Sequence, residues 1–74
     1  MKVVIAMTRV NSSAVQREML RLGIGVRELA KRAKIPANTV SVLHRKDSRV
    51  FLPTLAKLAQ ALQVEPQSLI KAVE

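Results

Sequence analysis

The chain has 74 residues, a net charge of +8 and a hydrophobic content of 49%, which indicate one small globular domain and argue against disorder. Its lack of cysteine excludes disulfide bonds, thiolate metal sites and a cysteine nucleophile. No apolar run approaches the roughly 20 residues that a membrane-spanning helix needs, and the short apolar start lacks the features of a signal peptide. We therefore expect a single domain over residues 1–74 that is cytoplasmic and not bound to a membrane.

Residues 3–7, with the sequence VVIAM, favour an extended strand because they are rich in β-branched side chains. No second segment of the chain looks like a strand that could pair with them. Two interpretations stay open for this N-terminal arm, which we place within residues 1–11. Either it packs on the helices as an irregular apolar tail, or it pairs antiparallel with the same arm of a second subunit, since a lone strand leaves its backbone groups unpaired.

The first helix is expected from about Ala14 to Leu22, because residues 13–16 match a capping box. Gly23 suits the left-handed C-cap of this helix, and Gly25 suits the N-cap of the next one. The apolar side chains that face inward are Val15, Met19 and Leu22.

Residues 25–43 predict a helix-turn-helix, in which two short amphipathic helices are joined by a tight turn. Residues 34–36 interrupt the apolar pattern, because the residue before Pro36 avoids helical backbone angles while proline itself is accepted at a helix start. The second helix of such a motif can enter the major groove of DNA. The apolar stripes comprise Val26, Leu29, Ala30 and Ala33 in the first helix, and Val40 and Leu43 in the second.

The rest of the chain predicts a basic loop and two more helices. Residues 44–51 show no sustained period and form the loop, Pro53 begins the fourth helix, and Glu65-Pro66 begins a short fifth helix. The expected fold class is therefore all-α, a compact five-helix domain to which the arm adds at most a short strand. The apolar positions are Leu55, Leu58, Ala59 and Leu62 in the fourth helix, and Leu69, Ile70 and Val73 in the fifth. If the protein forms a dimer, its interface is expected either at the N-terminal arm or at these apolar positions of the fifth helix.

The positive charge is concentrated around the helix-turn-helix. Residues 17–49 carry nine basic and three acidic residues, a net charge of +6, whereas residues 50–74 are neutral. A basic motif beside a neutral segment is typical of a nucleic-acid-binding domain. The alternative, a solvated basic face without a partner, does not explain why charge and motif coincide.

Three blocks of residues resemble a known family. They are Glu28-Leu29-Ala30, Thr39-Val40-Ser41 with Leu43, and residues 55–62 (LAKLAQAL) followed by Val64. Through these blocks, residues 15–70 resemble the lambda-repressor-like, Cro/CI-type (XRE) helix-turn-helix domains without insertions. The resemblance implies a five-helix fold, a homodimer on a near-palindromic site of double-stranded DNA, and a role as a repressor or related transcriptional regulator.

The chain departs from the family pattern at several positions. Val26 stands where members often have a phosphate-contacting Gln, and Lys34 stands where the turn commonly has Gly, which predicts a positive φ at Lys34. Met19 and His44 occupy the positions of a frequent Arg–Glu pair, so both partners of that pair are absent together and no buried charge is left alone. His44 has no companion ligand for a metal.

The family pattern places the base-reading side chains on the second helix of the motif. Asn38 is expected either to pair with adenine or only to support the first turn of the helix, and Thr39 either to bind a phosphate or its own backbone. Small methyl surfaces suit thymine, and DNA shape supplies further preference. The expected base-reading residues are Ala37, Asn38, Ser41 and Val42, and the expected phosphate-contacting residues are Arg27, Thr39, Arg45, Lys46 and Arg49.

Other classes of function are weaker candidates. An enzyme is not expected, because one histidine, no cysteine and five scattered acids supply no catalytic pair, metal site or cofactor site. Reading of single-stranded RNA is disfavoured by the single aromatic residue. The alternative that remains is an antitoxin that binds its own promoter and a toxin protein; an anti-repressor is another conceivable protein partner.

Overall fold

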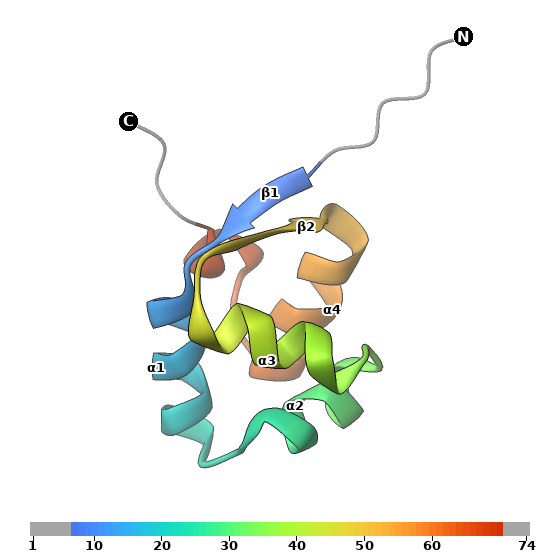
Figure 1. The fold of residues 1–74 in the computed structure, drawn as a ribbon. Helices are drawn as coiled ribbons and strands as arrows, with labels where there is room; N and C mark the ends of the chain where they lie inside the picture. Colours follow the sequence, from blue (N-terminus) through green and yellow to red (C-terminus); the bar gives the residue numbers. More distant parts are fainter. Residues whose placement is uncertain (1–6, 71–74) are drawn as a thin grey trace, which may run out of the picture.

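The computed structural model describes residues 7–70, which form two short strands, four α-helices and one 3-10 helix (Figure 1). In chain order the elements are β1 (Met7–Val10), α1 (Ser12–Leu22), α2 (Val26–Ala33), α3 (Ala37–Arg45), β2 (Ser48–Phe51), α4 (Leu52–Leu62) and η1 (Pro66–Leu69). The expectations for residues 3–6 and for Val73 lie outside the described residues.

The apolar stripes expected from the sequence meet in a single core. Leu29 of α2, Leu43 of α3 and Leu58 of α4 are almost completely buried, and burial of each such side chain stabilises the fold by roughly 1.5–3 kcal/mol. No polar side chain of the described residues is buried with them. The core therefore positions the helices by apolar packing, and polar links act only at its margin.

The expected left-handed helix ends are confirmed at two positions. Gly23 ends α1 with φ 69°, and Lys34 ends α2 with φ 59°. Gln63 adds a third left-handed end after α4, with φ 61°. Each of these ends turns the chain sharply, which allows helices of 8 to 11 residues to pack around a small core.

The expected start of α1 is wrong by two residues. The helix begins at Ser12, and its N-cap is Asn11, whose side chain accepts a hydrogen bond from the backbone N–H of Ser13 (3.0 Å). Asn is as good an N-cap as Ser, and the N–H of Ser12 is bound by Asp47, 35 residues further along the chain. That distant partner is not visible in a local capping motif.

The expected basic loop at residues 44–51 contains a strand, and this corrects the prediction. β2 pairs antiparallel with β1 in the register Met7↔Phe51 to Val10↔Ser48, so the end of the N-terminal arm finds its partner within the same chain. Val10 also forms a bridge with Ile70, and the N–H of Asn11 donates to the carbonyl of Leu69 (2.7 Å). Strands of four residues with basic neighbours give little periodicity, and their pairing is a long-range event.

The expected fifth helix is also corrected. Its place is taken by the four-residue 3-10 helix η1, after which Ile70 is extended and bridges to Val10. Leu69, one of the apolar positions of the expected fifth helix, is completely buried in the core of this chain and is not available as a dimer surface. Among the described residues the fold thus has four α-helices, with a small sheet on the side of the molecule that Figure 1 shows above α3.

Candidate nucleic-acid interface

The helix-turn-helix expected at residues 25–43 forms as α2, a tight turn and α3. At the turn, the N–H of Ile35 donates to the carbonyl of Ala30 (3.1 Å), and Pro36 is the N-cap of α3. Val40 and Leu43 bury one side of α3 against the core. The opposite side of α3 is consequently left at the surface.

The outer side of α3 carries the side chains that the sequence suggested for base reading. Ala37 and Asn38 are exposed, and Ser41 and Val42 are partly exposed. Their spacing of three and four residues places them one above the other on a helix. The side chain of Asn38 makes no hydrogen bond within the described part of the chain, so its amide is free to pair with a ligand.

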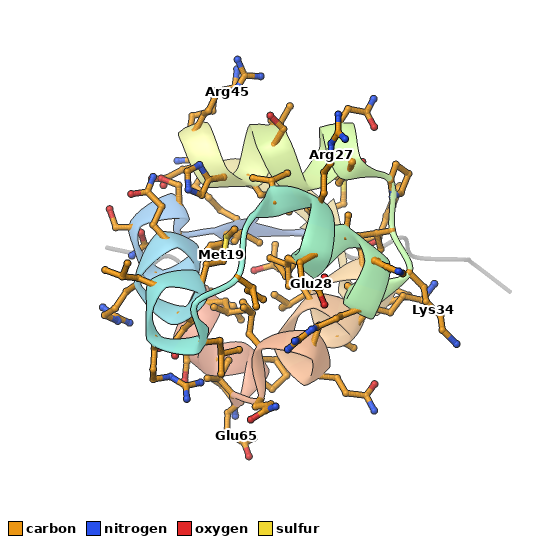
Figure 2. All side chains as sticks on the ribbon, turned by 90° about the horizontal axis from the view of Figure 1, so that it is seen from below. Met19, Arg27, Glu28, Lys34, Arg45 and Glu65 are labelled. Atoms are coloured by element: carbon orange, nitrogen blue, oxygen red, sulfur yellow. The ribbon has the colours of Figure 1, made fainter. Side chains whose placement is uncertain are left out.

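Two arginines flank this surface. Figure 2 shows Arg27 and Arg45 pointing away from the core, Arg45 at the C-terminal end of α3 and Arg27 toward its other end, while Glu65 lies on the opposite side of the molecule. Arg45 also donates from Nε to the carbonyl of Ser41, at 3.4 Å. The remaining expected phosphate contacts are Lys46 and Arg49, which are exposed after α3, and Thr39, which is partly exposed within it.

The arginines divide into two groups by their ion pairs. Arg17 and Arg21 pair with Glu18 (3.6 and 2.6 Å), and Arg32 pairs with Glu28 (2.9 Å). The other arginines are Arg9, Arg27, Arg45 and Arg49, and within residues 7–70 none of them has an acidic partner within 4 Å. The arginines around α3 therefore keep their full charge available for an anion.

Two polar links fix the C-terminal end of α3 to α1, and sequence reasoning missed both. The side-chain amide of Gln16 donates to the carbonyl of His44, which lies in the last turn of α3. The carboxylate of Asp47 accepts from the N–H of Ser12 (2.9 Å) and from its hydroxyl (3.1 Å). Gln16 and His44 are 28 positions apart, and Ser12 and Asp47 are 35 positions apart. The sequence signals only that the helix ends have backbone groups in need of partners, and it does not indicate which distant residues supply them.

The positions of the missing Arg–Glu pair have different surroundings. Met19 is buried in the core, whereas His44 is only partly buried. The flexible thioether side chain of Met19 fills its place in the core without burying a charge that would need an ionic partner. At these two positions α1 and α3 therefore have no ionic link, and Met19 contributes to the apolar core instead.

A further polar link joins α1 to α4 through Arg21, which also forms an ion pair within α1. The hydrogen bond from Arg21, together with its positive charge and that of Arg17, lowers the pKa of Glu18 below its ordinary value of 4.5 in spite of partial desolvation. Arg21 also donates from Nη2 to the carbonyl of Leu62 (2.9 Å), the last residue of α4. Arg21 and Glu18 therefore stabilise α1 and its attachment to α4.

An open hollow of about 410 Å³ between α2 and α4 is lined by Arg32, Ala33, Lys34, Lys57, Gln60 and Ala61. Within residues 7–70 there is no cluster of three or more potential metal ligands, and no helix is long and apolar enough to cross a membrane.

Several solved structures share this fold. The restriction-modification controller protein C.AhdI from Aeromonas hydrophila is 24% identical with a TM-score of 0.71, and the match covers 77% of this chain and 86% of that protein. A hydroxyethylphosphonate dioxygenase variant is 21% identical with a TM-score of 0.78, and native PhpD with cadmium is 21% identical with a TM-score of 0.76. Both of these matches cover 89% of this chain, which spans only 14% of the longer chains.

No curated protein matches the chain significantly. The family model of the Cro/C1-type HTH DNA-binding domain, in contrast, matches residues 14–74, which include the whole of α1 to η1 except the first two residues of α1. With the geometry of α2 and α3 described above, this match establishes that the chain belongs to the family of Cro/C1-type helix-turn-helix DNA-binding domains.

Proposed function

We propose that this domain is a cytoplasmic transcriptional repressor that binds a specific site on double-stranded DNA as a homodimer. It acts by occupying that site, and it catalyses no reaction. The observation that carries the proposal is the exposed side of α3, whose polar and methyl groups lie between arginines that have no ionic partner in residues 7–70. A DNA major groove offers base edges in its floor and phosphates on both rims. The likeness to a controller protein supports a regulatory role.

The contacts are assigned by chemistry. The amide of Asn38 can donate to and accept from one adenine, which makes it the most discriminating group on α3. Ser41 offers one hydroxyl, and Ala37 and Val42 offer methyl surface for thymine. Arg27 and Arg45, with Thr39, Lys46 and Arg49, are assigned to the phosphates, which fix the register of α3 without reading sequence.

The experiment first selects the preferred site from a random duplex library at a stated salt concentration. It then compares Asn38→Ala with Arg45→Ala, measuring the dissociation constant on the selected and on random duplexes as a function of salt. Asn38→Ala should weaken binding to the selected duplex by roughly 1–3 kcal/mol per half-site and leave the salt dependence unchanged. Arg45→Ala should weaken binding to both duplexes and lower the slope of log affinity against log salt by about 0.9 per subunit.

Each arm has an outcome that contradicts the proposal. If the library yields no sequence bound more tightly than random DNA, the domain is not a specific DNA-binding regulator. If Asn38→Ala weakens both duplexes equally, Asn38 supports only the helix, and base reading has to move to Ser41, Val42 or DNA shape.

A further inference from the structure

The outward face of the small sheet pairs two arginines. β1 and β2 alternate, so that Val10 and Val50 are buried, whereas Arg9 and Arg49 are exposed. The antiparallel register places Arg9 directly opposite Arg49. Side chains at directly opposed positions of an antiparallel pair have Cβ atoms roughly 4.5–5.5 Å apart, so the two guanidinium groups can converge on one ligand.

The electrostatics of this pair favours an anion. Like charges directly opposite each other destabilise an antiparallel sheet. Neither arginine has an acidic side chain within 4 Å in the described part of the chain, in contrast to Arg17, Arg21 and Arg32. An anion bound between the two arginines offsets the repulsion between their guanidinium groups, because each group can donate charge-assisted hydrogen bonds to the anion.

The position of the pair indicates which anion. β2 begins three residues after the end of α3 at Arg45, with Lys46 and Asp47 between the two elements. Two of the proposed phosphate contacts, Arg45 and Lys46, are therefore close to Arg49 along the chain. Figure 1 shows the sheet running along the side of the molecule next to α3. The arginine pair thus continues the basic surface beyond the helix-turn-helix, where a bound duplex would present its sugar–phosphate backbone.

We propose that Arg9 and Arg49 together bind a backbone phosphate of the DNA, so that β1, which lies outside the helix-turn-helix, is part of the DNA-binding surface. The proposal rests on the proposed function, and it deepens it by assigning to Arg9 a role that the motif does not predict. Guanidinium groups match the geometry of phosphate oxygens through paired hydrogen bonds.

The test uses the whole chain and the variant Arg9→Gln, with Arg17→Gln as the matched control. Both variants remove one arginine charge, but Arg17 lies on α1 and has Glu18 as a neighbour at 3.6 Å. Arg9→Gln should weaken binding to every duplex about tenfold at 0.1 M salt and lower the log–log salt slope by about 0.9 per subunit. Arg17→Gln should leave the slope unchanged. An unchanged slope for Arg9→Gln in a protein that still binds DNA overturns the proposal and leaves the proposed function intact.

Thermal unfolding in low-salt chloride buffer provides a second readout. Removal of a like-charge pair should raise the Tm of Arg9→Gln above that of the wild type by about 1–5 °C, even though the variant binds DNA less tightly. A lower Tm would show that Arg9 supports the sheet, and it would overturn the proposal.

Inorganic phosphate separates the two sources of the ligand. If added phosphate raises the Tm of the wild type more than that of Arg9→Gln while the DNA salt slopes are equal, the pair is a site for free phosphate, and the proposal is wrong. If the wild type binds no duplex at all, the proposed function itself has failed, and the assignment to DNA fails with it.

Discussion

The Asp47 carboxylate joins the loop after α3 to the first turn of α1. It accepts two hydrogen bonds from Ser12, one from the backbone N–H and one from the hydroxyl. A carboxylate at a helix N-terminus satisfies an N–H that lacks an intrahelical partner and is favoured by the helix dipole. Asp47 is also the only acidic residue among residues 37–49. Its hydrogen bonds to Ser12 therefore attach an otherwise basic segment to α1.

We expect Asp47→Ala to lower the free energy of unfolding by about 1–2 kcal/mol, because the helix loses a cap and the loop loses its attachment. Urea unfolding at neutral pH measures this change. Ser13→Ala is the control, since Ser13 lies in the same turn but uses only its backbone N–H, which binds the side chain of Asn11. Equal losses in the two variants would show that the carboxylate adds nothing to the cap.

At the scale of the elements, the helix ends determine how the helix-turn-helix is shaped. Lys34 adopts the left-handed conformation at the end of α2, where a residue with a side chain is strained by roughly 1–2 kcal/mol. Its backbone N–H donates to the carbonyl of Ala30, and the next amide, of Ile35, does so as well. The backbone hydrogen bonds of the turn hold this conformation, and they do not require the lysine side chain.

We therefore expect Lys34→Gly to raise the free energy of unfolding by about 0.5–1 kcal/mol, the relief of strain exceeding the extra entropy of glycine in the unfolded chain. Lys31→Gly removes the same charge from the interior of α2 and should lower stability by about 1 kcal/mol. Chemical unfolding of both variants gives the two values. A less stable Lys34→Gly would mean that the lysine side chain makes a net favourable contact at the hollow that it lines with Lys57.

At the scale of the whole molecule, the apolar surface is as unevenly distributed as the charge. Met7, Phe51 and Leu52 are each about half exposed (46–48%). Met7 lies opposite Phe51 in the sheet, and Leu52 follows Phe51 where β2 leads into α4. Leu69, which the sequence offered as part of a dimer interface, is completely buried in the core of its own chain and is not available. The surface around Phe51 adjoins the N-terminal arm, and we expect the two subunits of a homodimer to meet there.

Sedimentation of the complex with the selected duplex should therefore show two subunits per site, since one short recognition helix reads only a few base pairs. Phe51→Ser should weaken dimer formation, whereas Leu20→Ser, at an isolated and 83% exposed position, should not. Deletion of residues 1–6 tests the arm while keeping the Met7↔Phe51 pair. One subunit per site at saturating protein would contradict the homodimer.

The helices could be predicted because each buries a stripe that repeats within a few residues. The stripe of α4 indicates the same buried residues in the sequence and in the structure, and the stripe of α2 differs only at Val26, which is partly buried. Gly23 marks a helix end by its local backbone preference, whereas the left-handed Lys34 follows from the resemblance to the family. The exposed side of α3 follows from these stripes. Its assignment to bases and phosphates stays a prediction.

The sheet and the polar links could not be predicted, because their partners are distant in the chain. Val50 pairs with Thr8, and Asp47 binds Ser12, in both cases across more than thirty residues. The four-residue β2 has only two inward positions, too few to show an alternation within a basic segment. The supposed fifth helix failed for a related reason, since Ile70 is drawn into an extended conformation by its bridge to Val10.

The bridge between Val10 and Ile70 has a consequence for how the domain can be joined to other chains. Opposed residues of an antiparallel bridge have Cα atoms roughly 4.5–5.5 Å apart, and β1 adds three residues at roughly 3.3 Å each before Val10. The two ends of the described fold, Met7 and Ile70, therefore lie within roughly 16 Å of each other. A unit of this kind can be inserted into a loop of a host protein through short linkers, or be linked end to end and reopened elsewhere.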